Sequence, residues 1–221
     1  MTPKHKLTIV ILIILGIGLF YVSISFQNAI YDSITVLEKF IRGHLVLGAL
    51  MFIVLSAFSA MLSPFSSVPL VPPAILVWGK LLTMLFLLTG WILGGIAGYA
   101  VGLYFGYPVV IKIINKYKVD RWVAEVPEKI GFWLIILFRL ISPSEIGYVF
   151  GIIRYSFLKY AVATAISEAP YAIAIVYVSD AFLNENPKLF LFIGGVWVVV
   201  FFYMIHLFRK RYNQLKNKSH V

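Results

Sequence analysis

Long apolar runs alternate with short polar segments along this chain, and two of the apolar runs are interrupted by prolines, serines and glycines. The interruptions lie at residues 63–73 and 142–147. Non-helical backbone at membrane depth leaves amide groups unpaired, so it is tolerated only where protein buries it or where it lines a wet cavity. Two interrupted segments at corresponding places in two halves are typical of a transport site. The candidate site residues in these breaks are Ser63, Pro64 and Pro69 in the first and Ser142 and Pro143 in the second.

The pattern predicts an all-α integral membrane protein in which a single membrane domain takes up the whole chain. Its apolar runs are long enough for helices that cross a bilayer, which takes about 20 residues. The predicted elements are a transmembrane helix at 7–26, an interfacial helix at 27–44, a re-entrant hairpin at 45–79, a transmembrane helix at 80–106, an amphipathic cytoplasmic segment at 107–130, a second re-entrant hairpin at 131–153, transmembrane helices at 156–180 and 189–208, and a basic tail at 209–221.

The first apolar run, at 7–26, follows a short basic start and allows two interpretations. Its length suits a retained span. Ser23 and Ser25 also suit the small-residue positions before a signal-peptide cut. We expect a retained helix, with cleavage as the open alternative.

Composition places the chain among polytopic membrane proteins. Of its 221 residues, 61% are hydrophobic and 13% charged, and the mean hydropathy is +0.94, which is too apolar for a soluble domain of this size. The net charge of +10 lies beside the spans rather than on a face with stacking aromatics, which argues against a nucleic-acid partner. The absence of cysteine excludes disulfides, thiolate zinc sites and cysteine nucleophiles. The four histidines share no metal-ligand spacing, so we expect no metal or other cofactor.

The distribution of lysine and arginine predicts the orientation. Most of these residues lie near the termini and in the central segment 107–130, and loops rich in lysine and arginine stay in the cytoplasm. With the helices at 7–26 and 80–106 each crossing once, the segment between them must enter and leave on the outer side. Segment 131–153 must enter and leave on the inner side. The sequence therefore predicts an inverted repeat of two re-entrant helical hairpins, each followed by a transmembrane helix, in a cell-membrane protein with both termini in the cytoplasm.

Five glycines stand at a regular spacing of four in the predicted helix at 80–106. They are Gly90, Gly94, Gly98, Gly102 and Gly106. Such a row of small residues lets another membrane helix approach the backbone closely. Static helix packing is the first interpretation, and a hairpin that slides along this face is the functional alternative.

Three charged residues in or beside the apolar segments are candidates for substrate binding or coupling. Arg139 stands shortly before the second break, where a lone charge costs about 3 kcal/mol, so it should face protein or water. A guanidinium suits two-pronged binding of a phosphate group, and the alternative role is to cap carbonyl groups freed by Pro143. Glu145 in the break and Glu168 in the helix at 156–180 could each pair with Arg139, take up a proton, or form a fixed ion pair.

Residues around the second break resemble the characteristic block of the DedA family, also called the VTT or SNARE-associated Golgi protein family. The matching residues are Phe138 to Pro143, Tyr148, Gly151, Phe157, Ala169, Pro170 and Tyr177. The proline-rich first hairpin and the glycine row stand where that family has its first hairpin and following helix. The resemblance covers about residues 45–182 and is closest to the TVP-like branch.

The resemblance implies two opposed re-entrant hairpins and the movement of lipids between leaflets. Bacterial members are linked to the recycling of undecaprenyl phosphate, and eukaryotic members to phospholipid scrambling. Arg139 matches an arginine that is important near the second hairpin of bacterial members. The acidic residues important near their first hairpin have no counterpart here, since residues 56–78 hold no Asp or Glu. Glu145 and Glu168 are the candidates to replace them in proton coupling.

We therefore expect a lipid translocase or scramblase that moves phospholipid or polyprenyl-phosphate head groups through a groove formed by the two hairpins. A proton-coupled transporter of a small soluble solute and a non-transporting scaffold that shapes the membrane are the alternatives. The chain has no nucleophile elbow, nucleotide loop or metalloprotease motif, so we do not expect an enzyme. The sequence leaves open the lipid, the direction and energy source of its movement, the involvement of protons, and whether the protein forms a homo-oligomer.

Overall fold

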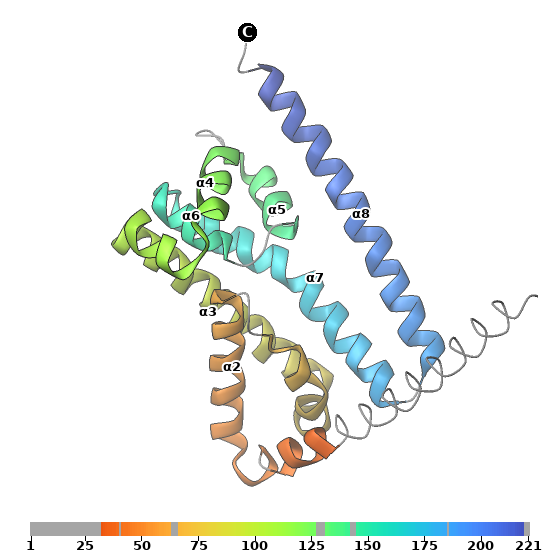
Figure 1. The fold of residues 1–221 in the computed structure, drawn as a ribbon. Helices are drawn as coiled ribbons and strands as arrows, with labels where there is room; N and C mark the ends of the chain where they lie inside the picture. The colour runs from red at the N-terminus through yellow and green to blue at the C-terminus, as the bar shows by residue number, and fades with distance from the viewer. Residues whose placement is uncertain are drawn as a thin grey trace, which may run out of the picture.

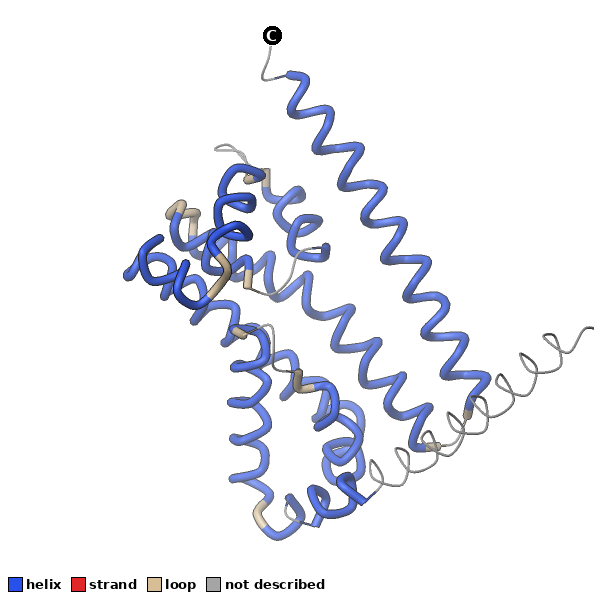
Figure 2. The backbone as a smooth tube through the Cα atoms, viewed as in Figure 1, coloured by secondary structure: helices blue, strands red, loops and turns tan. Residues whose placement is uncertain are grey.

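The computed structural model describes residues 32–39, 41–62, 66–126, 131–141, 145–184 and 186–218. Within these ranges every regular element is a helix (Figure 2). The predicted helix at 7–26 lies outside the described residues, and so do four candidate site residues, Ser63, Pro64, Ser142 and Pro143. The all-α class is confirmed for the part of the chain that the structure describes.

The helices follow one another with short connections. Helical stretches at 32–39 and 41–43 precede α2 (Leu45–Met61), the 3-10 helix η1 (Val68–Leu70), α3 (Val71–Ile113), α4 (Lys116–Glu125), α5 (Phe132–Ile141), α6 (Ile146–Ile152), α7 (Phe157–Leu183) and α8 (Pro187–Lys218). Figure 1 shows α7 and α8 side by side as an antiparallel pair, with α5 near both of them. The short helices α4 and α6 lie near the end of α3.

Two helical regions are long and apolar enough to cross a membrane. They are Val68–Ile113 and Phe157–Leu183. Large apolar side chains on these and neighbouring helices point outward, among them Val46, Leu81 and Leu158, which are 76%, 66% and 71% exposed. Apolar surface of this extent needs a cover of lipid or protein. The composition and the exposure together favour a membrane location.

The central element of the fold is α3, which packs against α2, α6 and α7. Its backbone leaves helical geometry at Gly79, where φ is 74°, and at Gly106, where φ is 66°. Glycine adopts this left-handed region at little cost because it has no Cβ. The two breaks lie next to the ends predicted for the helix at 80–106. The assignment of the flanking pieces to a hairpin arm and a cytoplasmic segment stays a prediction.

Helical structure extends further than the prolines and the basic tail suggest. The prediction that the first interruption runs through residue 73 is wrong in its extent, because η1 begins at Val68 and α3 at Val71. Pro69 lies in η1, and the next prolines fall in the first turn of α3, where the missing N–H would be unpaired in any case. The predicted tail at 209–221 is helical as far as Lys218, since lysine, arginine, glutamine and leucine are good helix formers.

The glycine row of α3 begins against α2. A Cβ added to Gly90 would lie 2.6 Å from the carbonyl oxygen of Ile53, and one added to Gly94 would overlap the carbonyl oxygen of Ala57. The two helices can therefore lie backbone to backbone only because these positions carry no side chain.

The next part of the row lies against α6. A Cβ added to Gly98 would lie 3.6 Å from the ring of Tyr148, and one added to Gly102 would overlap the carbonyl oxygen of Tyr148. The approach is reciprocal, because a Cβ on Gly151 of α6 would overlap the carbonyl oxygen of Tyr99 in α3. One helix thus receives α2 and α6 on successive parts of one glycine row.

The buried apolar side chains form two clusters, and both draw on α3 and α7. One cluster lies around α2 and includes Phe52, Leu87 and Val176. The other lies around α4, α5 and α6 and includes Val110 and Ile135. Two charged candidates lie on helices that contribute to this second cluster: Arg139 is in α5, and Glu145 directly precedes α6.

Candidate functional site

Arg139 lies in the last turn of α5, with a side chain that is only 1% exposed. The helix packs against α7 and α8. Nη2 of Arg139 donates to Oε1 of Glu168 in α7 at 2.6 Å, and Nη1 donates to the hydroxyl of Tyr160 at 3.1 Å. The structure therefore joins the arginine to one of the two carboxylates that the sequence offers as partners.

Tyr160 orients the guanidinium and is missing from the residues proposed from sequence. Its hydroxyl accepts from Arg139 and donates to the carbonyl oxygen of Gly95 in α3 at 3.0 Å. The guanidinium carbon of Arg139 lies 5.4 Å from the centre of the Tyr160 ring, in a cation–π arrangement. Glycines leave the space for the hydroxyl, since a Cβ on Gly147 would lie 2.5 Å from it. This one hydroxyl links α3, α5 and α7.

A polar stripe along α7 is the sequence signal that leads to Tyr160. Tyr160, Thr164 and Glu168 are spaced at i, i+4 and i+8, so they share one helix face, and all three are buried. The hydroxyl of Thr164 donates to the carbonyl of Tyr160 at 2.9 Å, and that of Ser167 donates to the carbonyl of Thr164 at 3.0 Å. A polar stripe on an apolar span is expected to face protein rather than lipid.

Glu145 lies at the start of α6 and faces a cation of α4. It is buried, and its Oε2 lies 4.0 Å from Nζ of Lys118, whose side chain is 49% exposed. The first turn of α4 is capped by Asn115, whose side chain accepts from the N–H of Tyr117 at 2.9 Å. An ion pair at this separation with an exposed partner contributes about 1 kcal/mol at most.

The backbone at the end of α5 has a hydrogen-bond donor other than Arg139. The hydroxyl of Tyr171 in α7 donates to the carbonyl oxygen of Leu140. Tyr171 thus performs carbonyl capping of the kind considered for Arg139, while the guanidinium is directed at Glu168 and Tyr160.

The first interrupted segment makes neutral polar contacts. The hydroxyl of Ser59 donates to that of Ser67 at 3.1 Å, and Nε1 of Trp91 donates to the same Ser67 oxygen at 3.2 Å. Pro69 is exposed. Residues 45–78 contain no charged side chain, so the groups suited to an anion lie in and around the second segment.

A tyrosine connects the two interrupted segments inside the protein. The hydroxyl of Tyr148 in α6 donates to the carbonyl oxygen of Met61, the last residue of α2, at 3.2 Å. Tyr148 is 1% exposed. The end of α2 and the body of α6 are therefore neighbours although they are far apart in the sequence.

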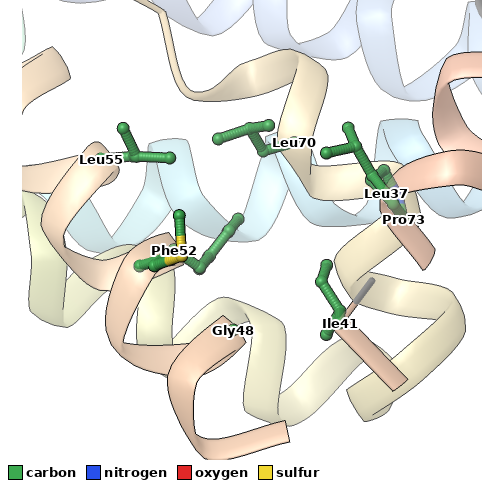
Figure 3. A pocket seen from close by; sticks show the side chains of 8 residues that line it. Leu37, Ile41, Gly48, Phe52, Leu55, Leu70 and Pro73 are labelled. Atoms are coloured by element: carbon green, nitrogen blue, oxygen red, sulfur yellow. The ribbon is translucent and has the colours of Figure 1, made fainter. Parts of the chain in front are cut away.

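An apolar recess lies where residues 32–43, α2 and the start of α3 meet (Figure 3). Its lining consists of Leu37, Ile41, Gly48, Met51, Phe52, Leu55, Leu70 and Pro73. Walls of this composition suit hydrocarbon and offer no hydrogen bond to a charged head group. The recess shares no residue with the Arg139 cluster, so the two differ in place and in chemistry.

The Arg139 cluster can bind an anion, and the geometry indicates how. A guanidinium presents parallel N–H donors that match two oxygens of a phosphate or carboxylate, and Glu168 holds one of those donors at present. Within the described ranges, no group of three or more His, Cys, Asp or Glu side chains could hold a metal ion. The donors of the guanidinium have the chemistry to bind an anion, and such an anion would compete with Glu168 for them.

Comparison with known families identifies a match across this region. Residues 63–181, more than half of the chain, match the model of the VTT domain. The match spans both interrupted segments, the glycine row and the Arg139 cluster. Comparison with curated proteins and with solved structures found no match.

Proposed function

The chain belongs to the VTT domain family, the domain of DedA and SNARE-associated proteins, and from this premise we propose that it moves phospholipid or polyprenyl-phosphate head groups between the leaflets of a membrane. Family membership and the long apolar helices support the membrane location that this activity requires. The activity makes and breaks no covalent bond, so the protein acts as a translocase or scramblase rather than as an enzyme.

The observation that carries the proposal is the buried pair of Arg139 and Glu168 beside an interrupted helix. A buried ion pair is often no more stabilising than apolar side chains of the same size. Its presence in an apolar segment therefore favours a functional role. In the proposed mechanism a lipid phosphate replaces Glu168 on the guanidinium and accepts a further hydrogen bond from Tyr160, while the acyl chains stay in the lipid.

The proposal includes two opposed re-entrant hairpins. α2 with the start of α3 forms one, and α5 with α6 forms the other. Their common contact with the glycine row supports this arrangement, as does the hydrogen bond from Tyr148 to Met61. The head group would cross where the two tips approach each other.

The proposed orientation keeps both termini and the central basic segment in the cytoplasm of a cell-membrane protein. It is supported by the lysines and arginines that gather in and beside α4. Because the chain has no cysteine, Lys116→Cys introduces a single thiol. An impermeant thiol reagent should label this variant in inverted vesicles. Labelling from outside intact cells would contradict the orientation.

A double substitution separates phosphate binding from a structural role. Arg139→Met with Glu168→Leu removes both charges and keeps similar side-chain volumes, so no buried charge is left uncompensated and the protein should stay folded. In liposomes that contain fluorescent phospholipids, the wild-type protein should move lipid between leaflets and the double variant should not. Thermal unfolding of both proteins verifies that they are folded.

The matched control is the ion pair between Lys80, which directly follows the break of α3 at Gly79, and Asp180 in the last turn of α7. Their Nζ and Oδ2 lie 3.1 Å apart, and the lysine side chain is 48% exposed. Lys80→Met with Asp180→Leu should leave transfer unchanged. Wild-type transfer by a well-folded Arg139→Met, Glu168→Leu protein would end the proposed role of Arg139. Uptake of a soluble solute along a pH gradient, without lipid transfer, would favour the transporter, and the absence of both activities would favour the scaffold.

A further inference from the structure

The apolar recess beside α2 has the size of a ligand site (Figure 3). Segment 32–43 forms one wall, α2 the second, and η1 with the first turn of α3 the third. The recess holds about 390 Å³ of space, part of it open to the surroundings, and ligand pockets typically measure about 300–1,000 Å³. Along α2 it extends from Gly48 to Leu55, which is roughly 10 Å of helix. One leaflet contributes about 15 Å, half of the hydrocarbon core of a bilayer, so the recess is long enough for much of one acyl chain.

The wall from segment 32–43 is the apolar face of an amphipathic stretch. Ile34, Leu37 and Ile41 recur at helical spacing, and Ile34 and Ile41 are only 4% and 8% exposed. Lys39, on the opposite face, is exposed. A helix with this pattern lies in the membrane interface with its apolar face toward the hydrocarbon. The segment therefore places the recess directly beneath the layer of lipid head groups.

A hydrogen bond and a close packing contact hold segment 32–43 beside the recess. Nη2 of Arg42 donates to the carbonyl oxygen of Leu76 in α3 at 2.9 Å. A Cβ added to Gly48 would lie 3.1 Å from Cγ2 of Ile41, so the segment approaches α2 closely at that point. The recess thus lies between elements that are fixed to each other, and its shape is part of the fold.

The recess opens onto the outward face of α2. Met51 and Leu55 line it and are 43% and 45% exposed. The outward face continues beside them with Leu47, Leu50 and Val54, which are also exposed. Water finds no hydrogen-bond partner among such side chains, and an unfilled space forfeits the van der Waals contacts of its walls. The material that a membrane supplies to this surface is hydrocarbon.

We propose that the recess binds one acyl chain of a membrane phospholipid, whose head group lies at the polar face of segment 32–43. This lipid is resident rather than transported, because the residues that line the recess offer no polar side chain to a moving head group. The bound chain joins the segment to α2 and α3 by filling the space between them. The site is separate from the Arg139 cluster and does not depend on lipid transfer by the protein.

Two pairs of neighbouring substitutions test the site. Leu55→Trp and Leu37→Trp enlarge side chains that line the recess from different walls. Their controls, Val54→Trp and Val36→Trp, place the same side chain one residue away, at positions that are 50% and 68% exposed and outside the lining. After extraction in mild detergent, native mass spectrometry should find a single phospholipid on the wild type and on both controls. Each recess variant should retain at least roughly fivefold less, because an overfilled space has no room for its ligand.

Thermal stability provides a second readout. When phosphatidylcholine is added to delipidated protein in detergent, the Tm of the wild type and of Val54→Trp should rise, since a ligand of the folded state stabilises it. Leu55→Trp should show less than about half of this rise, because the indole occupies the site. Without lipid, Leu55→Trp should unfold at a Tm close to that of Val54→Trp, which verifies that it is folded.

Crosslinking of the wild-type protein makes the test independent of any variant. A phosphatidylcholine with a diazirine in its acyl chain, added to the protein in detergent and then washed, should label Met51 and Leu55. Leu50 and Val54 on the outward face should stay largely unlabelled, because lipid that only surrounds the helix is washed away.

The contrary outcomes are equally definite. A wild-type protein that retains no phospholipid, or equal retention by the recess variants and their controls, would overturn the proposal. Even labelling of α2 around its outward face would mean surrounding lipid only, and the absence of label from the recess would mean that polypeptide or detergent fills it. Either result would also overturn the proposal. If Leu55→Trp does not fold, Leu37→Trp and the crosslinking decide.

Discussion

The segment from α2 to the start of α3 and the segment from α5 to α6 meet the same central helix but differ in chemistry. Both approach α3 at glycines, with Gly94 against α2 and Gly102 against α6. The first segment adds neutral hydrogen bonds around Ser67, whereas the second contributes the buried charge of Arg139. Packing through backbone contact makes few demands on the other side chains. One mode of assembly can therefore support a neutral segment and a charged one.

The difference also determines what each segment loses when a contact is removed. A neutral hydrogen bond contributes about 1 kcal/mol net. Removal of one partner of a buried ion pair costs about 3–5 kcal/mol because the other charge stays behind. Substitutions at equivalent depth should therefore have unequal effects in the two segments, except at the glycines, where the effects should be equal.

The largest effect is expected at the shared glycine row. Gly94→Leu and Gly102→Leu each force a side chain into a backbone carbonyl, of Ala57 and Tyr148 respectively. Because a backbone carbonyl cannot move aside as a flexible side chain does, each should lower the free energy of unfolding by about 5 kcal/mol or more, measured by thermal unfolding in detergent. Gly194→Leu in α8 is the control, because a Cβ there meets nothing within 4 Å. A large loss of stability for only one of the two variants would show that the two segments do not pack against α3 in the same way.

The second effect sharpens the contrast between charged and neutral contacts. Arg139→Ala should cost about 3–5 kcal/mol of stability, because Glu168 is left uncompensated, and should abolish lipid transfer in whatever protein stays folded. Ser67→Ala should cost about 1–3 kcal/mol, because Trp91 loses its buried acceptor. The comparison is made by chemical denaturation of both variants under the same conditions. Equal losses would mean that the charge of Arg139 is already solvated in the native protein.

A pair of aromatic substitutions separates stability from activity. Tyr160→Phe leaves the Gly95 carbonyl without its donor, and Trp91→Phe leaves the Ser67 hydroxyl without the indole donor. Each should lower stability by about 1–3 kcal/mol. Lipid transfer in liposomes should fall for Tyr160→Phe and stay near the wild-type rate for Trp91→Phe. If the rate of lipid transfer fell equally in both variants, Tyr160 would have a structural role only.

The smallest effect is expected at the exposed pair of Lys80 and Asp180, outside the two segments. Lys80→Met should change the free energy of unfolding by less than about 1 kcal/mol, because water screens a pair with a half-exposed lysine. Added salt should reduce even this difference, which unfolding at low and high ionic strength would reveal. A loss as large as that of Arg139→Ala would remove the distinction between buried and exposed pairs.

The sequence predicts the helical class and the family because both depend on local patterns. Apolar runs, prolines and the spacing of glycines are visible without a structure, and the all-α class and the VTT family are confirmed. The extent of the first interruption is not predicted correctly, since Pro69 and its neighbours suit a helix start as well as a loop. A proline by itself does not tell these two settings apart.

The contacts of the site depend on helices that are distant in the sequence, and the sequence predicts them less well. It offers Glu168 as a partner for Arg139 but leaves Glu145 equally open, because charge alone does not define which helices meet. Tyr160 is overlooked because an aromatic residue in an apolar span is usually part of the core. Tyr160 stands four residues before Thr164 and eight before Glu168, on the polar face of α7. This spacing separates it from an ordinary core aromatic residue only when that face is known to contact α5.

The central position of α3 has a consequence for the order of events during synthesis. α2 leaves the ribosome before its binding surface exists, because Gly90 and Gly94 are translated later, whereas α6 emerges when Gly98 and Gly102 are already in place. Chains fold from the N-terminus as they are made, so the small-residue face of α2 stays uncovered until this part of α3 has been made. The uncharged segment is thus the one exposed to misassembly, and an insertion factor that shields nascent helices would act on it first.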